Sequence, residues 1–184
     1  MGWLSPATDK LAFRPPARAS YKREDVMLWL KTVRGNDLPA LYLDRGHRLT
    51  LLVSHANAED MGQSARMWSV LGQHLKANVF CYEWSGYGHA TGTPSEANLH
   101  ADATAALVHL MEVHELRPAS EIVLVGKSLG TCACCHLASK ETFRGLLLIS
   151  GIASGMRVRR PEFKPELAPA GNRRRRVRQL ASRS

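Results

Sequence analysis

The stretch EIVLVGKSLGTCACCHLAS, residues 121–139, decides the fold that we expect for this chain. Its first five residues form a short apolar run rich in β-branched side chains, which is typical of a buried strand. Residues 129–140 are expected to form a helix. Between the two stands GKSLG, residues 126–130, which fits the pattern G-x-S-x-G in the strand–turn–helix context that this pattern requires. The sequence therefore predicts a tight turn between a strand and a helix.

Each position of this turn has a predicted role. Gly126 and Gly130 are expected because a side chain at either position would collide with the turn. Ser128 is the candidate catalytic nucleophile, since its hydroxyl would project above the carboxyl end of the sheet. The amide of Leu129, at the start of the helix, is a candidate oxyanion-hole donor. The alternative is a glycine-rich helix start in which Ser128 serves only as an N-cap.

Two further loops are candidate parts of the site. In the loop after the strand at 49–54, the amide of Asn57 is the expected second oxyanion donor, with Ala58 close behind it. His55 in the same loop is too early in the chain for a catalytic base on this template, and it is expected to fix the loop and line the site. Tyr87, in a glycine-rich loop, either lines the mouth of the site or serves only the turn.

Strand and helix patterns alternate on both sides of the turn, and a β-hairpin precedes them. This order predicts an α/β fold with a mostly parallel sheet and an N-terminal antiparallel hairpin. In the expected helix at 62–76, Met67, Val70, Leu71 and Leu75 recur at helical spacing and mark an apolar face. Pro118 ends the expected helix at 96–115. The expected strands are 26–33, 38–43, 49–54, 78–84, 121–125 and 144–149, and the expected helices are 62–76, 96–115 and 129–140.

Four stretches resemble a known family: KLAF (10–13), SHANAEDMGQ (54–63), YEWSGYGHATGTPSEANLHAD (82–102) and VGKSLGT (125–131). They are similar to the palmitoyl-protein hydrolases called alpha/beta hydrolase domain-containing protein 17. The resemblance covers about four-fifths of the chain. It implies the alpha/beta-hydrolase fold and a serine hydrolase whose nucleophile is Ser128. It also implies a substrate that is an acylated protein, cleaved at a thioester, or a small ester.

The chain departs from this family in three places. The family begins with a palmitoylated cysteine-rich stretch, whereas residues 1–9 contain no cysteine. Ala56 follows His55 where the family has glycine, and if this backbone needs a positive φ, alanine costs about 1 kcal/mol. The similarity ends near Val158, before the last two strands of the family's sheet and the triad acid and histidine that follow them.

We therefore expect a C-terminally truncated domain with impaired activity. His136 is the sole histidine after Ser128, and it lies roughly 12 Å further along the helix, out of reach of the hydroxyl. The strand at 144–149 is expected to become an exposed edge that invites pairing with another chain. Two alternatives stay open: a non-catalytic hydrolase-like fragment acting as an interaction module, and a binder of anionic membranes through a basic tail.

Composition and charge complete the expected organisation. The net charge of +9 is concentrated in residues 157–184, which hold ten Arg and Lys against two Glu. We expect a loose segment at 1–24, an incomplete domain at 25–156 and a basic, disordered tail at 157–184. The tail favours weak contact with anionic membranes over nucleic-acid binding, because no nucleic-acid motif precedes it.

The same composition bounds the location and the cofactors. The sequence has no run of 18 or more apolar residues, so we expect no transmembrane segment. Its N-terminus lacks the apolar core of a secretory signal. We expect a cytoplasmic protein, peripheral at membranes in the alternative with tail contact. The four cysteines lack the paired spacing of a zinc site, so neither a metal nor another cofactor is expected.

Overall fold

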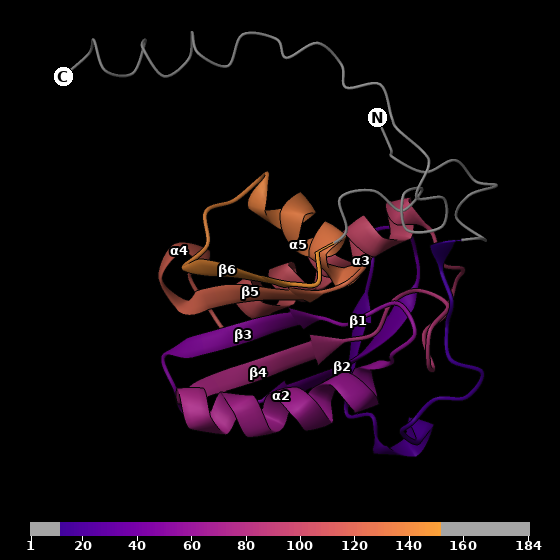
Figure 1. Ribbon diagram of the computed structural model, residues 1–184, viewed down its shortest axis with the longest axis horizontal. Coiled ribbons are helices and arrows are strands. Elements are labelled where there is room, and N and C mark those ends of the chain that lie inside the picture. Colours follow the sequence, from indigo (N-terminus) through magenta and orange to yellow (C-terminus); the bar gives the residue numbers. More distant parts are fainter. Residues whose placement is uncertain (1–11, 152–184) are drawn as a thin grey trace, which may run out of the picture.

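A computed structural model describes residues 12–151, which form a six-stranded sheet with helices on both faces (Figure 1). The strand order is β1-β2-β4-β3-β5-β6. Strands β4, β3, β5 and β6 are parallel, and β1 and β2 join them by antiparallel pairing. The strands are β1 Leu28–Lys31, β2 Asp37–Leu43, β3 Leu49–Ser54, β4 Ala77–Tyr82, β5 Ile122–Lys127 and β6 Gly145–Ile149. The helices are η1 Arg23–Asp25, α2 Met61–Leu75, α3 Glu96–Glu112, α4 Pro118–Glu121 and α5 Gly130–Ala138. The predicted fold class is confirmed.

The N-terminal hairpin is also confirmed. Strands β1 and β2 pair from Leu28 opposite Ala40 to Lys31 opposite Asp37. Gly35 adopts φ 84° in the turn, a conformation that glycine takes at no steric cost. The hairpin adds antiparallel strands to one edge of a sheet that is otherwise parallel.

Two hydrophobic cores lie on the two faces of the sheet. Helix α2 covers one face, where Trp68 is the largest buried side chain. Helices α3 and α5 cover the other face (Figure 1), and their buried residues pack against β-strand residues such as Leu52 and Leu124. The strands between the helices are therefore apolar on both faces, as expected for a parallel sheet.

The apolar face that the sequence predicts for α2 is wrong, although the helix itself is present. Met67, Val70, Leu71 and Leu75 are 39–59% exposed. The residues that face the sheet are mostly small: Met61, Ser64, Ala65, Trp68 and Gly72. A Cβ atom at Gly72 would lie 2.5 Å from Val79 Cγ2, so the helix approaches β4 too closely for larger side chains there. The close contact between α2 and β4 decides which side of the helix is buried, and the spacing of apolar residues in the sequence does not reveal this contact.

Pro118 begins a helix in addition to following one. Helix α3 ends at Glu112, and Pro118 then occupies the first position of the one-turn helix α4. This position suits proline because the first helical N–H has no partner inside the helix. The sequence predicted the end of α3 and missed α4.

The described part of the N-terminal segment, residues 12–24, contains no strand, but it is packed against the domain. Phe13 is buried and meets Trp84 edge to face, with ring centroids 6.4 Å apart. The backbone N and hydroxyl of Ser20 each donate to the Asp60 carboxylate at 2.5 Å. The domain boundaries stay predictions, because residues 1–11 and the tail at 157–184 lie outside the described residues.

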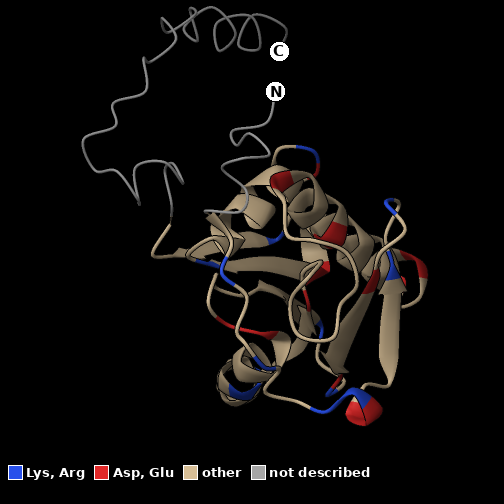
Figure 2. Ribbon diagram, turned by 90° about the vertical axis from the view of Figure 1, so that its right-hand side faces the viewer, with Lys and Arg blue, Asp and Glu red and all other residues tan. Residues whose placement is uncertain are grey.

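Strand β6 is the last strand of the described sheet, and it is apolar and exposed. Leu146, Leu147 and Leu148 are 45%, 45% and 41% exposed. Within residues 12–151, β6 pairs only with β5. Within residues 12–151, basic and acidic residues are nearly balanced in number, and Figure 2 shows both kinds spread over several elements. None of the helices in the described range combines the length and apolar character that a membrane crossing requires.

Candidate active site at the turn between β5 and α5

The structure contains the tight turn that the sequence predicts, and its backbone is strained at Ser128. Ser128 adopts φ 52°, in the left-handed region that costs a residue with a side chain roughly 1 kcal/mol or more. Its backbone is held on both sides: Ser128 N donates to Ile149 O at 2.8 Å, and Thr131 N donates to Ser128 O at 3.0 Å. The side chain is half-buried rather than enclosed. The neighbouring strand and helix together hold the serine in this conformation.

The two glycines of the turn are required by close backbone contacts. A Cβ atom at Gly126 would lie 2.8 Å from the carbonyl oxygen of Gly130 and from Cα of Thr131. A Cβ atom at Gly130 would lie 2.1 Å from Ser54 O and 2.5 Å from His55 O. Helix α5 therefore starts directly against the end of β3, and only glycine fits at these two positions.

Leu129 forms the transition into helix α5. Its backbone is already helical, with φ −60° and ψ −29°, and its side chain is buried. No acceptor for its backbone N–H occurs among residues 12–151. The first N–H groups of a helix carry partial positive charge and can bind an anion. The amide of Leu129 is thus available beside Ser128.

The loop after β3 lies next to this turn. Ser54 is in register with Gly126 on the adjacent strand β5, so both chains leave the sheet side by side. Residues 56–59 form a tight turn in which Glu59 N donates to Ala56 O at 3.1 Å. Ala56 does not have a positive φ, so the cost that was expected for alanine at this position does not arise.

Asn57, within that turn, anchors the N-terminal segment through its side chain. Its Oδ1 accepts from Arg14 N at 2.9 Å and from the Tyr87 hydroxyl at 2.7 Å. Its Nδ2 donates to Ala12 O at 2.6 Å. Ala58, the second candidate donor, is exposed. The side chain of Asn57 thus makes three hydrogen bonds within the domain, and its backbone amide stays the candidate oxyanion donor.

His55 and Tyr87 do not line an open site, which corrects the sequence-based expectation. Both are buried, with exposed fractions of 1% and 0%. The His55 ring stacks on Trp84 with centroids 4.0 Å apart, and its Nδ1 lies 2.9 Å from Ala56 O. Apolar packing under the loop takes both rings inward, so they support Asn57 and Ala56 from below.

A buried carboxylate that sequence reasoning missed completes this support. Glu83 is fully buried, and its Oε1 lies 2.9 Å from His55 Nε2, within ion-pair distance but without good hydrogen-bond geometry. Its Oε2 accepts from the Tyr21 hydroxyl at 2.9 Å and from Met61 N at 3.0 Å. Glu83 therefore links the N-terminal segment, the loop after β3 and the start of α2. The one signal in the sequence was an acidic residue at the end of an apolar strand.

Comparison with known proteins identifies the fold family of this chain. A family model described as "alpha/beta hydrolase fold" matches residues 50–177. The chain belongs to the alpha/beta hydrolase fold family. The match includes both the turn at Ser128 and the loop at 55–59.

Curated relatives within this hydrolase family carry the resemblance further. Alpha/beta hydrolase domain-containing protein 17B of Homo sapiens is 36% identical over 136 residues, which are 73% of this chain and 47% of the relative. Alpha/beta hydrolase domain-containing protein aho-3 of Caenorhabditis elegans is 49% identical over 112 residues, which are 61% of this chain and 33% of the relative. These matches confirm the predicted resemblance to alpha/beta hydrolase domain-containing protein 17. The chain spans less than half the length of these relatives.

Solved structures support the same fold. An alpha-beta hydrolase from Vibrio vulnificus superposes with a TM-score of 0.65 at 20% identity, over 97% of this chain and 68% of that chain. An esterase from Pyrococcus furiosus superposes with a TM-score of 0.59 at 18% identity, over 76% of this chain and 56% of that chain. At these identities the likeness concerns the fold alone.

The histidine that follows the nucleophile candidate in this hydrolase domain is engaged elsewhere. The ring of His136 stacks on that of His100, with centroids 3.8 Å apart and planes 6° apart. Burial, followed by the proximity of His100, lowers the pKa of His136 to about 4. An imidazole that binds a proton so weakly, two helical turns from Ser128, does not supply a general base.

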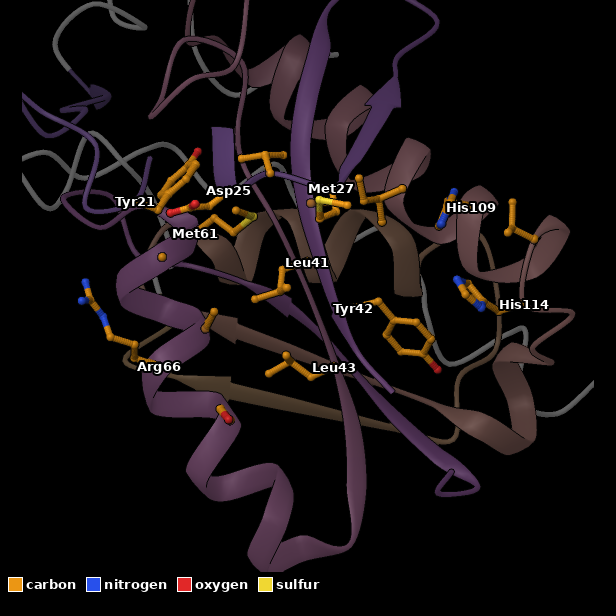
Figure 3. A pocket seen from close by; sticks show the side chains of 17 residues that line it. Tyr21, Asp25, Met27, Leu41, Tyr42, Leu43, Met61, Arg66, His109 and His114 are labelled. Atoms are coloured by element: carbon orange, nitrogen blue, oxygen red, sulfur yellow. The ribbon is translucent and has the colours of Figure 1, made fainter. Parts of the chain in front are cut away.

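A cavity of the domain lies away from the turn. It is a groove of about 790 Å³ along β2, between α2 and the end of α3 (Figure 3). Leu41 and Leu43 form its floor, and neither Ser128 nor the loop at 55–59 contributes to its lining. The candidate site at the turn is therefore separate from this groove.

Proposed function

We propose that this chain carries the nucleophile side of a serine hydrolase that acts on acyl esters or thioesters, of the type that removes fatty acyl groups from proteins. The observation that supports this most directly is the strained φ of 52° at Ser128 between two glycines that cannot bear a side chain. Such strain is maintained only where the surrounding structure enforces it. The preference for acylated proteins follows from the resemblance to alpha/beta hydrolase domain-containing protein 17.

In this proposal, Ser128 Oγ attacks the carbonyl carbon of the acyl group. The carbonyl oxygen then becomes an oxyanion, which the backbone amides of Leu129 and Asn57 stabilise, with Ala58 as the neighbouring candidate. Preorganised amides of this kind typically contribute about 10²- to 10³-fold each in rate. The bond to the leaving oxygen or sulfur breaks as the acyl-serine forms, and the leaving group ends as the alcohol or thiol with the proton lost by the Ser128 hydroxyl. Water later hydrolyses the acyl-serine, which releases the fatty acid and restores the hydroxyl.

The proton of Ser128 needs an acceptor, and His136 is stacked on His100 away from the turn. The acid and histidine of the triad are proposed to lie in sequence that this chain does not include. Loss of the base costs orders of magnitude, but oxyanion stabilisation and binding leave residual activity. We therefore propose slow acyl transfer to Ser128. The competing proposal, favoured by the position of His136, is a non-catalytic module that keeps the acyl-binding side of the fold.

A fluorophosphonate label tests the two proposals on residues 1–184. Covalent labelling of the full chain that is lost in Ser128→Ala supports an activated nucleophile. Ser139→Ala is the matched control, because Ser139 is an exposed serine at the end of the same helix, and it should label like the parent chain. A folded preparation that takes up no label after prolonged incubation would contradict the hydrolase proposal and support the non-catalytic one.

A further inference from the structure

The side chain of Glu59 joins the two loops that form the candidate site. One carboxylate oxygen, Oε2, accepts a hydrogen bond from Ala56 N at 3.2 Å. Since Glu59 N donates to Ala56 O, the turn that carries Asn57 is closed by two hydrogen bonds between the same two residues. The conformation of the proposed oxyanion loop thus depends on this carboxylate.

The other carboxylate oxygen contacts the turn between β5 and α5. Glu59 Oε1 forms an ion pair with Nζ of Lys127, the residue immediately before Ser128. The two side chains are 23% and 32% exposed, so the pair is shielded from water only in part. A single carboxylate therefore contacts the turn of Asn57 on one side and, on the other, the side chain of Lys127, the neighbour of Ser128 in the chain.

We infer that Glu59 and Lys127 are positioning residues that set the distance between the Asn57 amide and Ser128. This inference rests on the proposed function, because it assigns the pair a part in oxyanion stabilisation. Neither side chain needs to touch the substrate. A shift of about 1 Å in the position of a catalytic group can cost on the order of 100-fold in rate, so a tether between the two loops is sensitive to small changes.

A partly exposed ion pair contributes little to global stability, so variants at these positions are expected to fold. Lys127→Met removes the tether and leaves the bond from Ala56 N to Glu59 intact. Glu59→Gln keeps an acceptor for Ala56 N and removes the charge that Lys127 contacts. Lys127→Arg keeps the cation and serves as the conservative rescue. Lys31→Met is the matched control, because it removes an ion pair with Asp37 on the distant hairpin.

Two readouts on the full chain test the inference. The first is the rate of labelling of Ser128 by a fluorophosphonate. Lys127→Met and Glu59→Gln should each lower this rate by roughly 10- to 100-fold. The double variant should be no slower than the slower single variant, because the two residues act through one contact. Lys127→Arg should restore most of the rate, and Lys31→Met should match the parent chain.

The second readout is amide hydrogen exchange of residues 54–61, which does not require a reactive serine. Exchange in this loop should accelerate in Lys127→Met, and should be unchanged in Lys31→Met and in Lys127→Arg. If the parent chain takes up no label, the proposed function fails and the exchange rates alone decide whether the tether exists. Unchanged exchange in Lys127→Met would overturn the inference. So would unchanged labelling in this variant of a chain that does react.

Discussion

Replacing Gly130 with alanine tests the close contact between the start of α5 and the end of β3. The new Cβ atom would lie 2.1 Å from Ser54 O and 2.5 Å from His55 O. The shorter distance is nearly 1 Å below the 3.0 Å under which real Cβ contacts are essentially never seen. Both obstacles are backbone atoms within or beside a central strand, so neither can move aside by a change of rotamer.

The cost is expected near the upper end of the range for overpacking, about 3 kcal/mol. For a domain of this size roughly 1 kcal/mol corresponds to 2–4 °C, so the melting temperature should fall by about 6–12 °C. Thermal unfolding followed by circular dichroism measures this. Gly145→Ala is the control, because its Cβ would meet only Val123 methyl carbons at 3.6 and 3.7 Å, an ordinary contact. If the Gly130→Ala chain had the same melting temperature as the parent chain, the close contact between the start of α5 and the end of β3 would be refuted.

Three further predictions concern buried charge, histidine stacking and the sheet edge. Burial raises the pKa of Asp102 to about 7, so the folded chain holds this proton more tightly than the unfolded chain, and stability should decline as the pH rises from about 4 to 7. Asp102→Asn should remove that decline in urea denaturation; an unchanged pH dependence argues against it. The lowered pKa of His136 means that the stability it contributes above about pH 6.5 is lost as the pH falls toward 4. His136→Gln should flatten this acid limb, and an NMR titration of His136 in the parent chain with a midpoint near 6.5 would contradict the assignment. Leu147→Lys, on the exposed strand β6, should reduce self-association in sedimentation velocity, and equal association of both chains would count against pairing at this edge.

Secondary structure was largely predictable because strands and helices leave periodic signals. The sequence placed β3 at 49–54 as observed, and it placed the other predicted strands and α2, α3 and α5 within a few residues. The one-turn helix α4 was missed, since four residues carry no periodic pattern. For α2 the helix was predicted but its buried face was not. The apolar side chains of Val70 and Leu75 are exposed, because the close approach of Gly72 to β4 turns the opposite side of the helix toward the sheet.

The sequence alone predicted the order of the strands along the chain and the tight turn at Ser128, because both depend on short-range patterns of glycine, apolar and β-branched residues. It predicted the family through four stretches that resemble known proteins. Only the tertiary structure decided which side chains hold together the loops and the N-terminal segment around the candidate site. Glu83, Glu59 and Phe13 are far from Ser128 along the chain, and their roles come from contacts that form when the strands align. Distances between such residues depend on how the strands and helices pack, and no local pattern in the chain encodes them.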